Sequence, residues 1–178
     1  MTDRRKKNIV ELTRTTVEEY ARAPKLPLVL LLDNVRSMQN VGSLLRTCDA
    51  FAVEEVVMAG ITGVPPHPEI SKSALGAEES VKWRHVEDAA AEVRAQIAQG
   101  VCVCVLEQTR GSVPLQDFVP ERGRRYMLVV GNEVDGVSQE IVDDSDVCLE
   151  IPQCGVKHSL NVAVSGAIAL WHFFSAQK

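Results

Sequence analysis

The sequence LPLVLLLD, residues 26–33, is a continuous apolar run that ends in an aspartate. Apolar side chains without polar alternation are typical of a strand that is buried on both faces. Similar runs, separated by segments of helical character, recur at residues 55–60, 101–107, 126–132 and 147–152. This alternation predicts a single α/β domain, in which helices cover both faces of a mostly parallel sheet.

Helices are expected between these strands and near both ends of the chain. Apolar residues at helical spacing predict an amphipathic helix that ends at Gly100. These residues are Val86, Ala90, Val93 and Ile97. Residues 41–51 and 6–20 are also predicted to be helical. The last helix, residues 160–174, is apolar on most sides and should be buried or lie in an interface.

The composition limits the class of protein. The chain has 178 residues, of which 46% are apolar and 24% charged, as in one soluble globular domain. No apolar run approaches the roughly 20 residues of a membrane-spanning helix, and the basic N-terminus lacks the apolar segment of a secretion signal. Five cysteines without a CxxC pair argue against a disulfide framework or a zinc site. We therefore expect a cytoplasmic protein without a bound metal.

The net charge of −5 argues against a nucleic-acid partner unless a local basic patch makes the contact. Two basic runs are candidates for such a patch. The first is Arg4, Arg5, Lys6 and Lys7, and the second is Arg122, Arg124 and Arg125. The second run directly precedes a predicted strand, so a solvated surface is its simpler interpretation.

The usual nucleotide-binding signatures are absent, since the sequence has no GxG pair, P-loop, HExxH or GxSxG. Polar and glycine residues gather instead in three loops, residues 34–46, 131–138 and 151–170. Arg46 lies opposite the apolar stripe of its helix, and Glu133 lies between two glycines. Ser159 and Asn161 lie at the start of the last helix, where free N–H groups suit an anion. Taken singly, these residues could be a solvated arginine, an acidic turn and a helix cap.

In order and spacing, the three loops resemble the motifs of the SpoU (TrmH-type) branch of the SPOUT methyltransferases. The matching positions are Asn40-Val-Gly42-x-x-x-Arg46, Gly131-Asn132-Glu133-x-x-Gly136-x-Ser138, and Ile151-Pro152 through Gly155 to Ser159-Leu160-Asn161-Val162. The resemblance spans residues 28–174. One departure is Gln153-Cys154, where many relatives have a methionine.

The resemblance implies a fold that the apolar pattern alone does not predict. In this family the C-terminal segment is threaded into a deep trefoil knot, an exception to the rule that chains do not knot. Family members are dimers, and an apolar last helix would suit such an interface. The chain then divides into a short basic helical extension, residues 1–24, and a SPOUT methyltransferase domain, residues 25–178.

The resemblance also implies an activity, the transfer of a methyl group from S-adenosylmethionine to a ribose 2′-OH of RNA. By match, the cofactor contacts Leu106, Thr109, Gly131, Ile151, Ser159 and Leu160. The catalytic residues by match are Arg46, Asn40, Glu133, Ser159 and Asn161.

Arg46 is the catalytic arginine of the family by match. A guanidinium keeps its proton under almost all conditions, so we expect Arg46 to orient a phosphate of the RNA and to stabilise the developing alkoxide. A role as general base, helped by that phosphate, stays open. Asn40 and Asn161 are expected to position the ribose and the loops, and Glu133 to fix Arg46 or the substrate.

Transfer RNA is the preferred substrate over ribosomal RNA, because ribosomal enzymes of this family often carry an additional N-terminal RNA-binding domain. The basic residues 4–7 would then contact RNA directly, and no contact with DNA or membrane is expected. Three alternatives remain: a base methyltransferase of the same superfamily, a non-catalytic RNA-binding relative, and a nucleotide oxidoreductase, against which the missing GxG argues.

Overall fold

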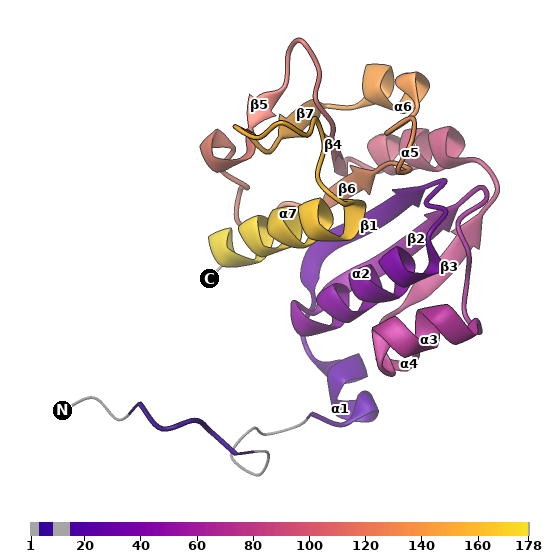
Figure 1. Ribbon diagram of the computed structural model, residues 1–178, viewed down its shortest axis with the longest axis vertical. Coiled ribbons are helices and arrows are strands. Elements are labelled where there is room, and N and C mark those ends of the chain that lie inside the picture. Colours follow the sequence, from indigo (N-terminus) through magenta and orange to yellow (C-terminus); the bar gives the residue numbers. More distant parts are fainter. Residues whose placement is uncertain (1–3, 9–14, 178) are drawn as a thin grey trace.

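The computed structural model describes residues 4–8 and 15–177. Its centre is a seven-stranded sheet in the order β3-β2-β1-β6-β4-β7-β5, and all neighbouring strands are parallel (Figure 1). The strands are β1 (Leu26–Asp33), β2 (Val53–Ala59), β3 (Trp83–Val86), β4 (Cys102–Leu106), β5 (Val113–Pro114), β6 (Tyr126–Val130) and β7 (Val147–Glu150). The predicted α/β fold with a parallel sheet is confirmed.

Helices cover both faces of this sheet (Figure 1). They are α1 (Val17–Arg22), α2 (Met38–Ala50), α3 (Pro68–Ala74), α4 (Ala77–Ser80), α5 (Ala89–Ala98), α6 (Gln139–Asp144) and α7 (Val162–Ala176), with a short 3-10 helix at Leu115–Asp117. Helices α2, α3, α4 and α7 contribute to the apolar cluster on one face. Helices α5 and α6 contribute to the cluster on the other face, so the predicted two-sided coverage is confirmed.

Two helix predictions need correction. The helix predicted for residues 6–20 is not formed at 6–8, residues 9–14 lie outside the described residues, and α1 begins later, behind a capping box. The amphipathic helix begins after Val86, because Val86 ends β3 and the side chain of Asp88 caps α5. An N-cap carboxylate that accepts a free N–H fixes the start of a helix more strongly than apolar spacing does.

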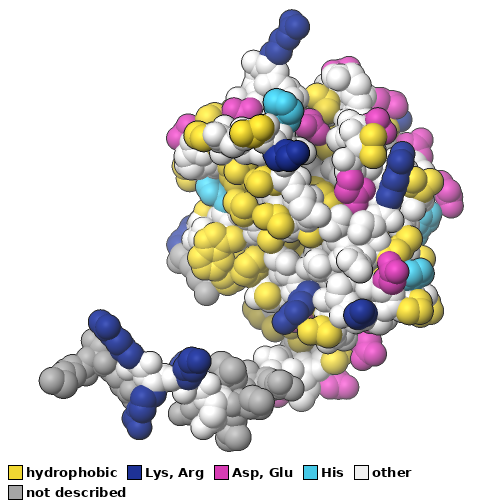
Figure 2. All heavy atoms as spheres, viewed as in Figure 1, with side chains coloured by type: hydrophobic (Ala, Val, Ile, Leu, Met, Phe, Trp, Pro, Cys, Tyr) yellow, Lys and Arg dark blue, Asp and Glu magenta, His cyan; other side chains and the backbone are white. Residues whose placement is uncertain are grey.

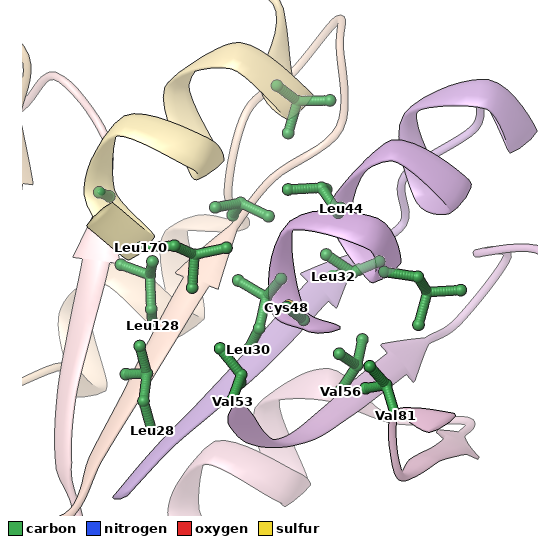
Figure 3. Close-up of a cluster of buried hydrophobic side chains, with 14 of the residues drawn as sticks. Leu28, Leu30, Leu32, Leu44, Cys48, Val53, Val56, Val81, Leu128 and Leu170 are labelled. Carbon is green, nitrogen blue, oxygen red and sulfur yellow. The ribbon is translucent and has the colours of Figure 1, made fainter. Parts of the chain in front are cut away.

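Strand β1 lies at the centre of both apolar clusters. Leu28, Leu30 and Leu32 pack under α2 and α7 (Figure 3), and Val29 and Leu31 pack on the side of α5 and α6. All five side chains are 0–1% exposed. Burial of one such side chain stabilises the fold by about 1.5–3 kcal/mol. The apolar run therefore anchors both layers of helices, as its lack of alternation predicts.

The order of the strands decides which loops meet. Strand β6 lies between β1 and β4, although β4 precedes it in the chain, and β7 lies on the far side of β4. Because the strands are parallel, the loops that follow β1, β4, β6 and β7 leave the sheet at one edge. The chain then returns across the sheet and packs α7 beside α2 (Figure 1). The trefoil knot stays a prediction that the resemblance implies.

The turn after β6 requires glycine at two positions. A Cβ atom on Gly131 would collide with the backbone of Gly136, and a Cβ on Gly136 would collide with the carboxylate of Glu107. Gly136 also has a φ of +73°, which disfavours other residues. The side chain of Asn132 accepts two N–H hydrogen bonds within the turn, at 2.9 and 2.8 Å. The turn is therefore held in one conformation at the edge where the loops meet.

Replacement of Gly131 by alanine is expected to lower the free energy of unfolding by about 1–3 kcal/mol, the usual cost of an extra carbon in a filled space. Chemical denaturation without added ligand measures this change. Gly111→Ala is the matched control, because a Cβ at Gly111 meets no atom within 4 Å. Equal stability of the two variants would show that the turn relaxes without cost.

Candidate active site

A pocket of about 440 Å³ opens at the carboxyl ends of β4, β6 and β7 and at the start of α7. This volume lies within the range of small-molecule sites. Apolar side chains of Leu106, Val130 and Ile151 line one part of it, and the turn after Gly131 lines another. The segment that leads into α7, including Asn161, also lines the pocket. Loops that are far apart in the sequence therefore share one cavity.

Most of the residues predicted to contact a cofactor line this pocket. They are Leu106, Gly131, Ile151, Ser159 and Leu160. Thr109 is not among the lining residues, and its carbonyl oxygen accepts a hydrogen bond from the hydroxyl of Ser112 at 2.9 Å. Thr109 thus stabilises the loop between β4 and β5 in the free protein.

Three predicted catalytic residues form one hydrogen-bonded chain. Asn40 donates from Nδ2 to Oε1 of Glu133 at 2.8 Å. Asn161 donates from Nδ2 to Oδ1 of Asn40 at 3.1 Å. The side-chain oxygen of Asn161 accepts the N–H groups of Ala163 and Val164. Asn161, and not Ser159, therefore caps α7. This chain links the start of α2, the turn after β6 and the start of α7.

The carboxylate of Glu133 also holds the segment before α2. It accepts the N–H groups of Arg36 and Ser37, at 3.1 and 3.2 Å. Partial burial tends to raise the pKa of Glu133, but the hydrogen bonds from Asn40 and from these N–H groups outweigh it and lower the pKa below its ordinary value. From the sequence, Glu133 is expected to fix Arg46 or the substrate. In the free protein its carboxylate bonds to the start of α2, and the described residues show no contact between Glu133 and Arg46.

Arg46 lies apart from this chain. It follows Asn40 by six residues in α2, about 9 Å along the helix axis, and it does not line the pocket. Its side chain is exposed and, among the described residues, has no hydrogen bond or ion pair. One turn before Arg46, Gly42 allows α2 to pack closely against α3, because a Cβ atom at this position would collide with Ser73 and Ile70.

Two carboxylates that the sequence analysis did not select support the same loops. Asp33 is 2% exposed, and its Oδ2 accepts the N–H of Ser138 at 3.0 Å. Glu107 accepts the N–H of Val137 at 3.1 Å. Each acid stands at or directly after the end of a buried strand, and this position is the signal that could have identified them.

The described residues offer little for other kinds of site. Within them, no group of three or more histidine, cysteine or acidic side chains could hold a metal ion, and the five cysteines are free thiols. No helix in the described part has the length and the apolar character needed to cross a bilayer. The basic residues 4–7 are exposed, and Figure 2 shows the Lys and Arg side chains of this segment standing away from the body of the protein.

Solved structures resemble this fold over most of the chain. The TrmH/SpoU tRNA modifying enzyme of A. aeolicus superimposes with a TM-score of 0.81 at 26% identity, and the match covers 90% of this chain and 80% of that one. The AdoMet bound rRNA methyltransferase from Sinorhizobium meliloti superimposes with a TM-score of 0.76 at 26% identity, over 85% of this chain and 60% of that one.

Sequence comparisons lead to the same group of proteins. The model of the SpoU rRNA Methylase family matches residues 27–171. The 23S rRNA (guanosine(2553)-2′-O)-methyltransferase RlmP of Bacillus subtilis is 32% identical over 157 residues, 87% of this chain and 60% of that protein. The tRNA (guanosine(18)-2′-O)-methyltransferase of Mus musculus is 30% identical over 153 residues, 84% of this chain but 9% of that protein. The chain thus spans only part of the length of these relatives.

Because the pKa of Glu133 is lowered in the fold, its ionised form stabilises the protein above the pKa of an unfolded glutamate, and this contribution is lost as the pH falls through the lower folded value. Glu133→Gln should therefore be about 1 kcal/mol less stable near pH 7, a modest value because the site is largely exposed. The difference should shrink below about pH 4. Thermal unfolding from pH 3 to 8 measures it.

Glu87→Gln is the control for this measurement, because the side chain of Glu87 is 94% exposed and its loss should change stability little at any pH. A stability difference between Glu133→Gln and the wild type that is independent of pH would contradict the role of the charge.

Proposed function

Because the chain belongs to the SpoU rRNA Methylase family, we propose that it transfers a methyl group from S-adenosylmethionine to a ribose 2′-OH of RNA. The observation that carries this proposal is the pocket itself. Two of the motif loops, residues 131–138 and 151–170, line it together with the end of β4. Hydrogen bonds from Asn40 to Glu133 and from Asn161 to Asn40 tie the remaining motif loop, at the start of α2, to these two. Relatives named as 2′-O-methyltransferases of tRNA and of rRNA support it, as does the AdoMet bound neighbour.

The lining of the pocket fits this cofactor. Leu106, Ile151 and Leu160 offer apolar contacts for an adenine ring, while the backbone at Gly131 and Ser159 offers polar groups. Acidic residues that also line the pocket complement the positive charge of the cofactor. When bound, the cofactor supplies a methyl group that is activated by the adjacent sulfonium.

The residues of the chain would orient the acceptor and stabilise its charge. A ribose hydroxyl is a poor nucleophile until its proton is removed, so alignment and anion stabilisation decide the rate. Arg46 has no competing partner among the described residues and would bind a phosphate of the RNA beside the acceptor ribose. The amides of Asn40 and Asn161 would position the ribose while Glu133 holds the start of α2.

We prefer tRNA over rRNA as the substrate, although relatives of both kinds are named. The exposed basic residues Arg4, Arg5, Lys6 and Lys7 would add phosphate contacts that do not depend on sequence. With RNA as substrate, we place the protein in the cytoplasm. The short N-terminal segment, residues 1–24, would then serve as an RNA-binding extension of the methyltransferase domain, residues 25–178.

We also propose that two copies of the chain associate through α7. Val164, Ile168 and Trp171 follow one another at helical spacing and are 49%, 41% and 55% exposed. Figure 2 shows an apolar patch on this face of the protein. A groove beside it is lined by Ile168 and Trp171 and also by Ile151, which belongs to the pocket lining as well. A second copy of the same apolar face would cover the patch and support the pocket.

Incubation of the protein with labelled cofactor and with purified tRNA or rRNA tests the activity, and nucleoside analysis then identifies the methylated atom. Arg46→Ala should reduce turnover by about two orders of magnitude, as expected for loss of a charge stabiliser, and should leave cofactor affinity within a few-fold. Arg94→Ala, on α5 and so on the other face of the sheet, is the control. Loss of cofactor binding in Arg46→Ala, or methyl groups found only on bases, would contradict the proposal.

Association through α7 predicts a dimer in analytical ultracentrifugation, and Ile168→Glu should convert it to a monomer because a carboxylate would be buried without a partner. Ile61→Glu is the matched control, since Ile61 is 63% exposed and lies outside α7. Circular dichroism checks that both variants fold. A monomeric wild-type protein, or a dimer unaffected by Ile168→Glu, would contradict this interface.

A further inference from the structure

The charges that line the pocket are of one sign. Four acidic residues contribute to its lining, Glu107, Glu133, Asp135 and Glu150. Within the part of the chain that the structure describes, no lysine or arginine lines the pocket, and His158 is the only lining side chain that could become cationic. The electrostatic potential in the pocket therefore favours a cation.

Within the described part of the chain, Asp135 is the only one of the four that forms an ion pair. Glu133 is already held by the amide of Asn40 and by the N–H groups of Arg36 and Ser37, which leaves Glu107 and Glu150. Glu107 accepts the N–H groups of Gln108 and Val137, and Glu150 accepts the hydroxyl of Ser112 at 2.8 Å. Among the described residues, neither Glu107 nor Glu150 forms an ion pair. By contrast, Asp135 lies 3.8 Å from the guanidinium of Arg36.

The fold places Glu107 and Glu150 at neighbouring strand ends. Leu106 in β4 pairs in register with Leu149 in β7, and the N–H of Glu107 donates to the carbonyl of Leu149 at 3.0 Å. Glu107 and Glu150 therefore stand at the ends of adjacent parallel strands. Both residues therefore add negative charge at the same edge of the sheet, where a bound cation is favoured.

We propose that Glu107 and Glu150 make the pocket selective for the charge of the cofactor. This inference rests on the proposed methyl transfer. In that reaction the S–CH₃ bond breaks and leaves its electron pair on sulfur, the 2′-oxygen bonds to the methyl carbon, and the hydroxyl proton passes to solvent. The cationic sulfonium becomes a neutral thioether, S-adenosylhomocysteine. Methyl transfer thus removes the positive charge that attracts the cofactor to the two carboxylates. S-adenosylhomocysteine therefore leaves the pocket more readily than S-adenosylmethionine does.

Calorimetry on the full chain with three ligands tests this inference without turnover. S-adenosylmethionine carries the sulfonium, sinefungin carries an ammonium at the same place, and S-adenosylhomocysteine carries no charge there. The wild-type protein should bind both cationic ligands at least about five-fold more tightly than the neutral one, the modest preference expected of attraction to partly exposed carboxylates. The preference should weaken as salt is added.

Glu150→Gln is the principal variant, because its amide oxygen still accepts the hydroxyl of Ser112. It should weaken binding of both cationic ligands about three- to five-fold and leave S-adenosylhomocysteine unchanged. Glu107→Gln should act in the same direction and provides a second variant if one of them folds poorly. Glu140→Gln, on α6 and outside the pocket, is the matched control.

The outcomes separate this inference from the proposed function. Equal affinity of the wild-type protein for all three ligands would overturn the charge selection and leave the methyltransferase assignment intact. Equal weakening of all three ligands in Glu150→Gln would assign the residue a structural role and overturn it as well. If none of the three ligands binds the wild-type protein, the proposed function fails and this inference fails with it.

Discussion

The site depends on one chain of hydrogen bonds, in which the carboxylate of Glu133 accepts the amide of Asn40, and the amide of Asn40 accepts that of Asn161. The three residues come from different strand ends and helix starts, and 121 positions separate Asn40 from Asn161. Parallel strands bring such loops to one edge but do not fix their distances. The hydrogen bonds between these side chains fix the distances between the loops. The same side chains also accept N–H groups at the starts of α2 and α7 that would otherwise be free.

These hydrogen bonds depend on a tight turn, in which two segments of backbone lie close together beside Glu133. Glu133 lies in the turn between Gly131 and Gly136, where neither position has room for a Cβ. Buried or half-buried carboxylates hold the next residues of this loop, since Asp33 accepts the N–H of Ser138 and Glu107 that of Val137. Acids therefore serve twice at this edge: they bind the backbone of the loop, and they make the pocket negative. A neutral side chain could replace the first role in part, but not the second.

Sequence reasoning predicts the strands well because burial on both faces leaves a direct trace, as in β1, where every residue from Leu28 to Leu32 is apolar and buried. The family resemblance also identifies Leu106, Gly131 and Ile151, which line the pocket. The partners of Glu133 could not be predicted. They depend on the insertion of β6 between β1 and β4, and strand order leaves no trace in local apolar spacing.

The arrangement of charge reconciles an acidic protein with an anionic substrate. The proposed cofactor is a cation and the proposed RNA is a polyanion, so a single field over the whole site would repel one of them. The fold separates the two tasks. Acidic residues line the pocket at the carboxyl ends of β4, β6 and β7. Arg46 is exposed on α2 and has no ion-pair partner in the described part of the chain. Because charges more than about 8–10 Å apart are screened in salt, each ligand meets mainly the field of its own side. A net charge of −5 therefore says little about affinity for RNA, since the position of a few side chains decides it.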